Sequence, residues 1–258
     1  MPHNTAAHLA VPFPPVSSCR LFDLPPGEGK TLTDRHAQIK NAYRQAGGHA
    51  SFYDGMITYS TLLGKAICRI VWNMDGEKNC AYLERALSGV PEGFAGRLLE
   101  VPVGTGVLTM PVYRTLPGAD INCLDYSPDM IVTARARADR MGNENQRFTK
   151  RDVGAQPFED DSFDVVLSLN GFHAFPDKEA AWPETYRVLR PGGTFCGCCY
   201  IRGGCARTDW FIRRLYQPKG YFTPPYETEE SLRKRLCAMY AEADVTRYEG
   251  IACFRCRK

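Results

Sequence analysis

The 258-residue sequence lacks the features of a membrane-spanning or exported protein. No run in it approaches the roughly 20 apolar residues that cross a bilayer. Its amino terminus has no basic stretch followed by an uninterrupted apolar one, because Pro12, Pro14 and Pro15 break the apolar residues there. We therefore expect a cytoplasmic protein without stable membrane insertion.

The sequence also has little net charge. Its 32 Lys and Arg residues nearly balance 29 Asp and Glu residues, and the formal charge of +3 does not indicate a nucleic-acid partner. Two basic clusters, Arg135, Arg137 and Arg140 in one and Arg213 and Arg214 in the other, would suit an anionic substrate or membrane headgroups. Solvated helix faces have the same composition, and they are our expectation.

Cysteine is plentiful, but its pattern does not indicate disulfides. Eleven is an odd number, and thiols in a cytoplasmic protein are mostly reduced. The groups at 196–199 and 253–256 raise the alternative of a metal or arsenic site. Strand alternation would place Cys196 and Cys198 on one face and Cys199 on the other. We therefore expect buried thiols that pack as small apolar side chains, and no metal.

The chain divides into three regions by composition and periodicity. Residues 1–30, rich in Pro, Gly and Ser, predict an irregular arm. Residues 31–95 carry apolar residues at helical spacing and predict a helical cap. From 96 to 258, apolar strands alternate with helices, which predicts a parallel sheet covered on both faces.

A hairpin is expected at the end of the third region. Strands at 243–248 and 251–257 are separated only by Glu249 and Gly250. This connection is too short for a parallel crossover, so the two strands must pair antiparallel if they are neighbours.

Residues 99–110, LLEVPVGTGVLT, predict a ligand-binding turn between a strand and a helix. Gly104 and Gly106 would let a ligand approach the backbone because they carry no side chain. A P-loop is excluded, since Val107 and Leu108 stand where its Lys and its Ser or Thr are required. A nicotinamide dinucleotide site lacks its third glycine, which Thr109 replaces, and stays open at this point.

Six segments, in order and at fitting spacings, decide between the alternatives. They are GTG after Glu100, LDYSPDM, RDV, PFEDDSFD, LNGFH and VLRPGG. This series resembles the class I S-adenosylmethionine-dependent methyltransferases, in particular the ubiquinone and menaquinone biosynthesis branch (methyltransferase type 11). The resemblance covers residues 96–200 closely. It implies an α/β, Rossmann-like three-layer fold with a seven-stranded mixed sheet and an antiparallel C-terminal hairpin.

The resemblance also implies where S-adenosylmethionine and its product S-adenosylhomocysteine bind. The turn from Glu100 to Gly106, with Thr105, would line the methionine end. Asp125 would hold the ribose, because one carboxylate can accept both hydroxyl protons. Pro102 stands where the family usually has its first glycine, which removes an N–H and fixes φ. Since Gly104 and Gly106 remain, we expect binding to survive.

The adenine end would lie beyond the next strands. Tyr126 and Met130 would pack near the base, Asp152 and the backbone of Val153 would read its edge, and Asn170 with Gly171 would border the acceptor. The cofactor-binding residues implied are thus Glu100, Pro102, Gly104, Thr105, Gly106, Asp125, Tyr126, Met130, Asp152, Val153 and Asn170.

Methyl transfer from a sulfonium needs alignment of the nucleophile and exclusion of water, but no triad and no metal. His173 would suit a general base, and a structural histidine between Phe172 and Phe175 is an equal alternative.

Further pocket residues are expected in the variable parts of the chain. Tyr43, Tyr53 and Tyr59 would suit the pocket wall or ordinary packing. Residues 203–226 would form a lid over an apolar acceptor, or a helix packed on the sheet.

We predict a methyltransferase acting on a small molecule that is aromatic, quinone-like or otherwise apolar, by direct in-line transfer. The alternatives are an arsenite or thiol-type acceptor and a non-catalytic S-adenosylmethionine-binding protein; a dehydrogenase is the least favoured. A homodimer is compatible with the sequence, and the cap and lid carry no motif that identifies the acceptor.

Overall fold

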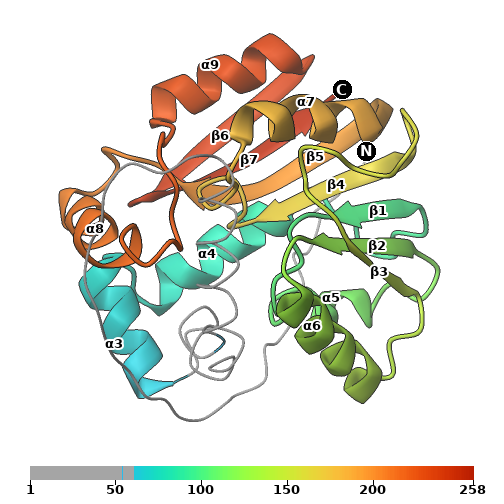
Figure 1. The fold of residues 1–258 in the computed structure, drawn as a ribbon, viewed down its shortest axis with the longest axis horizontal. Helices are drawn as coiled ribbons and strands as arrows, with labels where there is room; N and C mark the ends of the chain where they lie inside the picture. The colour runs from blue at the N-terminus through green and yellow to red at the C-terminus, as the bar shows by residue number, and fades with distance from the viewer. Residues whose placement is uncertain (1–53, 55–60) are drawn as a thin grey trace, which may run out of the picture.

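A seven-stranded mixed sheet forms the centre of the structure (Figure 1). The computed structural model describes Asp54 and residues 61–258. The strands are β1 (Arg97–Glu100), β2 (Asp120–Asp125), β3 (Gln146–Lys150), β4 (Phe163–Leu169), β5 (Leu189–Tyr200), β6 (Glu242–Tyr248) and β7 (Ile251–Arg257). Their order in the sheet is β3-β2-β1-β4-β5-β7-β6. The expected fold class is confirmed.

The strand directions also agree with the sequence. The pairs among β1 to β5 are all parallel. β7 pairs antiparallel with both β5 and β6, and the β6–β7 turn at Glu249 and Gly250 makes the expected hairpin. The hairpin therefore closes one side of an otherwise parallel sheet.

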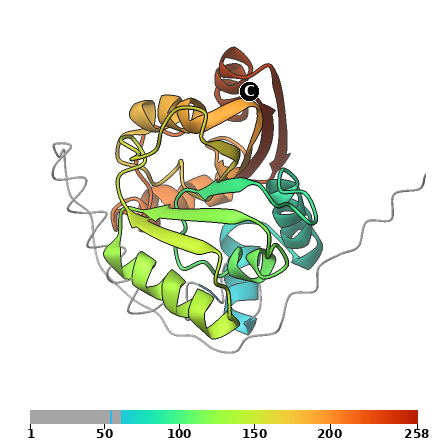
Figure 2. The ribbon, with the colours of Figure 1, turned by 90° about the vertical axis from the view of Figure 1, so that its right-hand side faces the viewer.

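Helices cover both faces of the sheet. They are α3 (Leu62–Val71), α4 (Gly76–Leu87), α5 (Met110–Tyr113), α6 (Pro128–Met141), α7 (Lys178–Val188), α8 (Ala206–Phe211) and α9 (Glu229–Met239), with a π-helical turn η1 (Ile212–Tyr216) after α8. Helices α4, α5 and α6 pack on one face and α7 and α9 on the other. Figure 2 shows α6 and α7 on opposite sides of the strands.

Local signals in the sequence explain where several helices begin and end. Ser127 caps α6 by accepting from the Met130 N–H, Pro128 starts the helix, and Gly142 ends it in the left-handed conformation. Helix α5 is a single short turn with Pro111 at its start, where a missing N–H costs nothing.

Part of the helical cap expected at residues 31–95 lies within the described residues, where it forms α3 and α4. Helix α4 packs directly on the sheet through Tyr82 and Leu83. The expected arm at 1–30, residues 31–53 of the cap, and Tyr43, Tyr53 and Tyr59 lie outside the described residues. In the part of the chain that the structure describes, no helix combines the length and apolar character needed to span a membrane.

Strands β4 and β5 approach each other closely at Gly197. This residue has φ 151°, and a Cβ built on it would lie 1.9 Å from the Ser168 carbonyl oxygen. Only glycine fits there without moving one of the two strands.

Candidate cofactor site

A cleft lies beyond the carboxyl ends of β1, β2 and β4, where the ligand site of an open α/β sheet is expected. It contains about 960 Å³ of empty space, part of it open to solvent. All eleven residues expected to bind the cofactor line this cleft. The strand order brings together four segments that are separate in the sequence.

The carboxylate of Asp125 is held in position by backbone N–H groups. Gly104 donates to Oδ2 at 2.9 Å, and Ser127 donates to Oδ1 at 2.8 Å. Burial raises the pKa of Asp125 to about 6, although these hydrogen bonds oppose the rise. Each oxygen keeps a further acceptor position, so the carboxylate can accept two hydroxyl protons from a ligand.

Glu100 lies buried at the end of β1 and contributes to the same cleft. The hydroxyl of Tyr113 donates to its Oε2 at 2.9 Å. Burial raises the pKa of Glu100 to about 8, an effect that the Tyr113 hydrogen bond lowers and the neighbouring Asp125 increases. The protonation state of Glu100 therefore depends on the charge of any ligand that binds nearby.

The turn after β1 depends on glycine at two positions. Gly104 has φ 55° and Gly106 has φ 67°, both in the left-handed region that side chains disfavour. At Gly104 a Cβ would meet nothing within 4 Å, whereas at Gly106 it would lie 2.9 Å from Met110. The first glycine therefore serves the backbone conformation, and the second also serves packing.

Pro102, the departure from the family pattern, packs against the loop after β4. A Cβ on Gly171 would lie 2.4 Å from Pro102 Cδ, so the proline ring occupies the space next to a glycine. The neighbouring residues keep their strand hydrogen bonds: the Val101 N–H donates to the Leu167 carbonyl, and the Val103 N–H to the Leu124 carbonyl. The turn thus tolerates the proline.

A residue far away in the sequence ties down this turn. The hydroxyl of Thr105 donates to Asp54 Oδ1 at 2.7 Å. Arg137, from α6, pairs with the Asp54 carboxylate and also donates to the Thr105 carbonyl. Asp54 is buried, and the three residues form a closed network on the outer side of the glycine turn.

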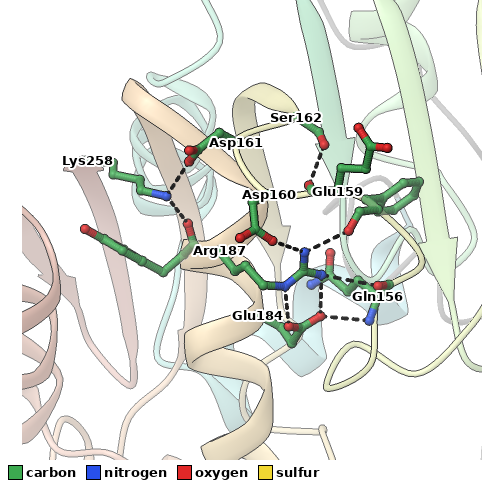
Figure 3. Close-up of polar contacts among 10 residues, drawn as sticks. Gln156, Glu159, Asp160, Asp161, Ser162, Glu184, Arg187 and Lys258 are labelled. Carbon is green, nitrogen blue, oxygen red and sulfur yellow. Dashed lines mark hydrogen bonds and ion pairs between the residues drawn. The ribbon is translucent and has the colours of Figure 1, made fainter.

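The loop that supplies Asp152 and Val153 is fastened to α7. Arg187 donates to Glu184, to Asp160 and to the Gln156 carbonyl, as Figure 3 shows. It also donates to the Phe158 carbonyl at 2.8 Å. Glu184 in turn accepts from the Gln156 N–H at 2.9 Å. This network ties the start of the PFEDDSFD segment to α7 and gives Asp160 a structural partner.

His173, expected as a general base or as a structural histidine, is buried beside Phe222. It is absent from the residues that line the cleft, and its ring stacks on Phe222 at 4.2 Å. Its Nδ1 accepts a hydrogen bond from the Tyr200 N–H at 3.1 Å. Burial lowers the pKa of His173 to about 3, so the ring is neutral. These contacts favour the structural alternative, and the base role stays a prediction.

The cysteines pack as the strand alternation predicts. Cys196 and Cys198 belong to the core on one face of the sheet, and Cys199 to the core on the other. Burial raises the pKa of Cys196 and of Cys198 to about 12, so both are protonated thiols. Among the described residues no group of His, Cys, Asp or Glu could hold a metal ion, and no cysteine lines the cleft.

Residues 203–226 contribute none of the residues that line the cleft. Their helical part, α8 and η1, packs on α3 and on the end of β5. A lid formed by this segment stays a prediction.

Sequence reasoning missed several residues of the site. Ser127 and Arg151 line the cleft beside predicted residues, and the helix-start signal in YSPDM could have indicated the serine. Phe175 and Pro176 line it just after LNGFH. Asp54 lies in no recognisable motif, and a single sequence gives no indication that its side chain contacts Thr105.

Comparisons with known proteins find relatives of the central part of the chain. Residues 98–193 match the family described as "Methyltransferase domain". A stretch of 109 residues is 40% identical to demethylmenaquinone methyltransferase from Thermus thermophilus and covers 42% of this chain and 49% of that protein. Another stretch is 39% identical to a probable phthiotriol/phenolphthiotriol dimycocerosates methyltransferase from Mycobacterium ulcerans, covering 38% of this chain and 37% of that one. The matches thus span at most about half of each relative.

The fold extends beyond the matched stretch. A crystal structure from Thermotoga maritima, an S-adenosylmethionine-dependent methyltransferase and possible histamine N-methyltransferase, superposes with a TM-score of 0.58. The match covers 88% of this chain and 100% of that one at 18% identity, a level that shows the fold alone. Residues 98–193 thus match the model of a methyltransferase domain, and the chain shares the fold of the Thermotoga maritima structure.

Proposed function

We propose that the protein transfers a methyl group from S-adenosylmethionine to a small aromatic or quinone-like acceptor. One observation carries this proposal: the cleft at the carboxyl ends of the strands is lined by every residue expected to bind this cofactor. The proposal covers the activity of the whole chain, of which the sequence match spans less than half.

The residues of the cleft fit the cofactor. Asp125 offers two carboxylate oxygens to the ribose hydroxyls, and the left-handed glycines leave the turn open for close approach of the methionine portion. Tyr126, Met130 and Val153 supply the apolar surface that an adenine ring needs. When bound, the cofactor supplies a methyl group already activated by the positive sulfur.

The chain's own task is then to position the acceptor and exclude water. Leu169, Phe175 and Pro176 form an apolar wall on the β4 side of the cleft, next to the amide of Asn170. None of the described residues lining the cleft is a histidine or a cysteine. A phenol or hydroquinone, whose hydroxyl proton is more acidic than that of an alcohol, fits this arrangement.

Two features favour an apolar ring compound over the arsenite alternative. The matched relative from Thermus thermophilus is named for demethylmenaquinone. The described cysteines are not gathered at the cleft, and the thiols at 196–199 face the cores on either side of the sheet. A thiolate trap for arsenic therefore has no support at this site.

Calorimetric titration with S-adenosylmethionine, S-adenosylhomocysteine and NADH tests the cofactor. We expect the first two to bind and Asp125→Ala to weaken both about 100-fold, since it removes charge-assisted hydrogen bonds. Asp129→Ala, which removes a nearby carboxylate outside the cleft lining, is the matched control and should bind normally. Binding of NADH alone would overturn the proposal in favour of a dehydrogenase.

A screen of phenols, hydroquinones and amines with radiolabelled cofactor then tests turnover. Methyl transfer to any of them would exclude a protein that only binds the cofactor. Cofactor binding without transfer to the whole panel would support that non-catalytic alternative.

A further inference from the structure

Two helical segments expose large apolar side chains to solvent. On α3, Leu62 is 88% and Ile70 is 54% exposed. On α8 and η1, Trp210 is 49% and Leu215 is 47% exposed. Elsewhere among the described residues, Val132 alone is a large hydrophobic side chain with comparable exposure. Single exposed apolar residues need no explanation, but four on adjoining segments do.

Hydrogen bonds join the two segments into one surface. Arg207 of α8 donates to the Arg69 carbonyl at 2.9 Å, and the buried Thr208 hydroxyl donates to the Val71 carbonyl at 2.6 Å. Trp72, at the end of α3, packs against Tyr200 and Phe222. Figure 1 shows α3 and α8 next to each other at one side of the molecule. The apolar side chains thus stand on a fixed frame.

The same surface carries positive charge. Arg69, Arg207, Arg213 and Arg214 are all exposed. The sequence of α3 has no acidic residue.

Asp209, the acidic residue in 206–216, is already engaged. It accepts from the Tyr200 hydroxyl at 2.7 Å and from the Gly203 N–H at 2.9 Å. Within the described part of the chain, Arg213 and Arg214 form no ion pair.

The surface lies on the edge of the sheet at which the cleft opens. α8 follows the carboxyl end of β5, and β5 runs parallel to β4, whose carboxyl end borders the cleft. Leu169, which lines the cleft, pairs in register with Cys198, two residues before β5 ends. A flat partner that covers α3 and α8 would therefore lie near the cleft.

We propose that α3 and residues 206–216 dock on an anionic lipid bilayer. Trp210, Leu215, Leu62 and Ile70 enter the boundary between headgroups and acyl chains, while the arginines bind lipid phosphates. The basic side chains complement the negative headgroups of the bilayer, and the exposed apolar side chains complement the acyl chains beneath them. The two segments lie on the membrane surface. This inference does not depend on methyl transfer.

Co-sedimentation of the full chain with vesicles tests the proposal. We expect binding to equimolar phosphatidylcholine and phosphatidylglycerol, little binding to phosphatidylcholine alone, and weaker binding at higher salt. Arg213→Ala/Arg214→Ala should reduce the partition coefficient about fivefold for each charge. Trp210→Ala should reduce it on the order of tenfold.

The double variant Arg114→Ala/Arg140→Ala is the matched control, because it removes two exposed charges from the end of α5 and from α6 and should bind like the unmodified protein. Absence of binding to anionic vesicles at low salt would overturn the proposal, as would equal losses in the control and in Arg213→Ala/Arg214→Ala. Self-association that Trp210→Ala abolishes in light scattering, without vesicle binding, would instead assign the surface to a second copy of the chain. Titration with S-adenosylmethionine gives an independent readout of the cleft.

Discussion

The cleft and the docking surface on α3 and 206–216 are built in different ways. The cleft is formed mainly by turns that directly follow strands, and its key groups are backbone N–H donors, glycines and a carboxylate at the end of β2. The docking surface joins two segments more than 130 residues apart through side-chain hydrogen bonds to carbonyls. The first arrangement produces short sequence motifs at regular spacing, whereas the second produces no motif in the sequence. Chemistry common to a family can thus be recognised in a single sequence, whereas partner choice requires the structure.

The largest effect should come from a substitution that breaks the sheet on which both regions depend. Gly197→Ala places a Cβ against the Ser168 carbonyl and should lower the free energy of unfolding by more than about 3 kcal/mol. Denaturant unfolding followed by circular dichroism measures this change. Gly203→Ala is the matched control: it also has a positive φ, but its Cβ would meet nothing within 4 Å, so about 1 kcal/mol is expected. Similar losses in the two variants would contradict the close approach of β4 and β5.

Lowering the pH should weaken cofactor binding in the cleft, while the arginines of the docking surface stay charged. Asp125 accepts ribose hydroxyls when ionised, and burial raises its pKa to about 6. Affinity for S-adenosylhomocysteine should therefore be highest above pH 6 and fall by up to about tenfold per unit below it. Calorimetry between pH 5 and 7 tests this dependence, with Asp125→Asn as the control that should show little of it.

The same raised pKa acts in the opposite direction on the unliganded protein. A protonated Asp125 favours the folded state, and this contribution is lost as the pH rises through about 6. Cofactor affinity that stays constant down to pH 5 would show that Asp125 does not hold the ribose.

A smaller effect should follow when the outer support of the glycine turn is removed. Asp54→Asn loses the charge that pairs with Arg137 and weakens the hold on Thr105. We expect about tenfold weaker cofactor binding, equivalent to about 1.4 kcal/mol, and faster amide exchange at residues 103–106. Asp139→Asn, a substitution of an exposed residue on α6, should change neither the cofactor affinity nor the amide exchange. Unchanged affinity in Asp54→Asn would mean that the turn holds its shape without this network.

The smallest effect on turnover is expected at His173, which packs beneath the segment leading to α9. His173→Asn keeps an acceptor for the Tyr200 N–H but removes the ring that stacks on Phe222. The rate constant kcat should change less than about threefold, while the free energy of unfolding falls by about 1–2 kcal/mol. A loss of 100-fold or more in kcat in the folded variant would restore the base role.

The sequence predicted the sheet, its hairpin and the lining of the cleft because each depends on local rules. Apolar strands at regular spacing, the proline that opens α6 and the glycines at 104 and 106 all act within a few residues. The position of His173 could not be predicted, since a residue next to a strand end faces either the ligand or the core according to packing from distant segments such as Phe222. For the same reason the contribution of Asp54 could not be foreseen.

The placement of β7 between β5 and β6 has a consequence for the order of folding. β6 is synthesised before β7, yet its partner in the sheet is β7, which also pairs with β5. Until residues 251–257 are available, the edge of β5 stays open and β6 has no strand to join. The nascent chain therefore passes through a stage with an unprotected sheet edge, at which chaperone capture or faulty association competes with completion of the fold.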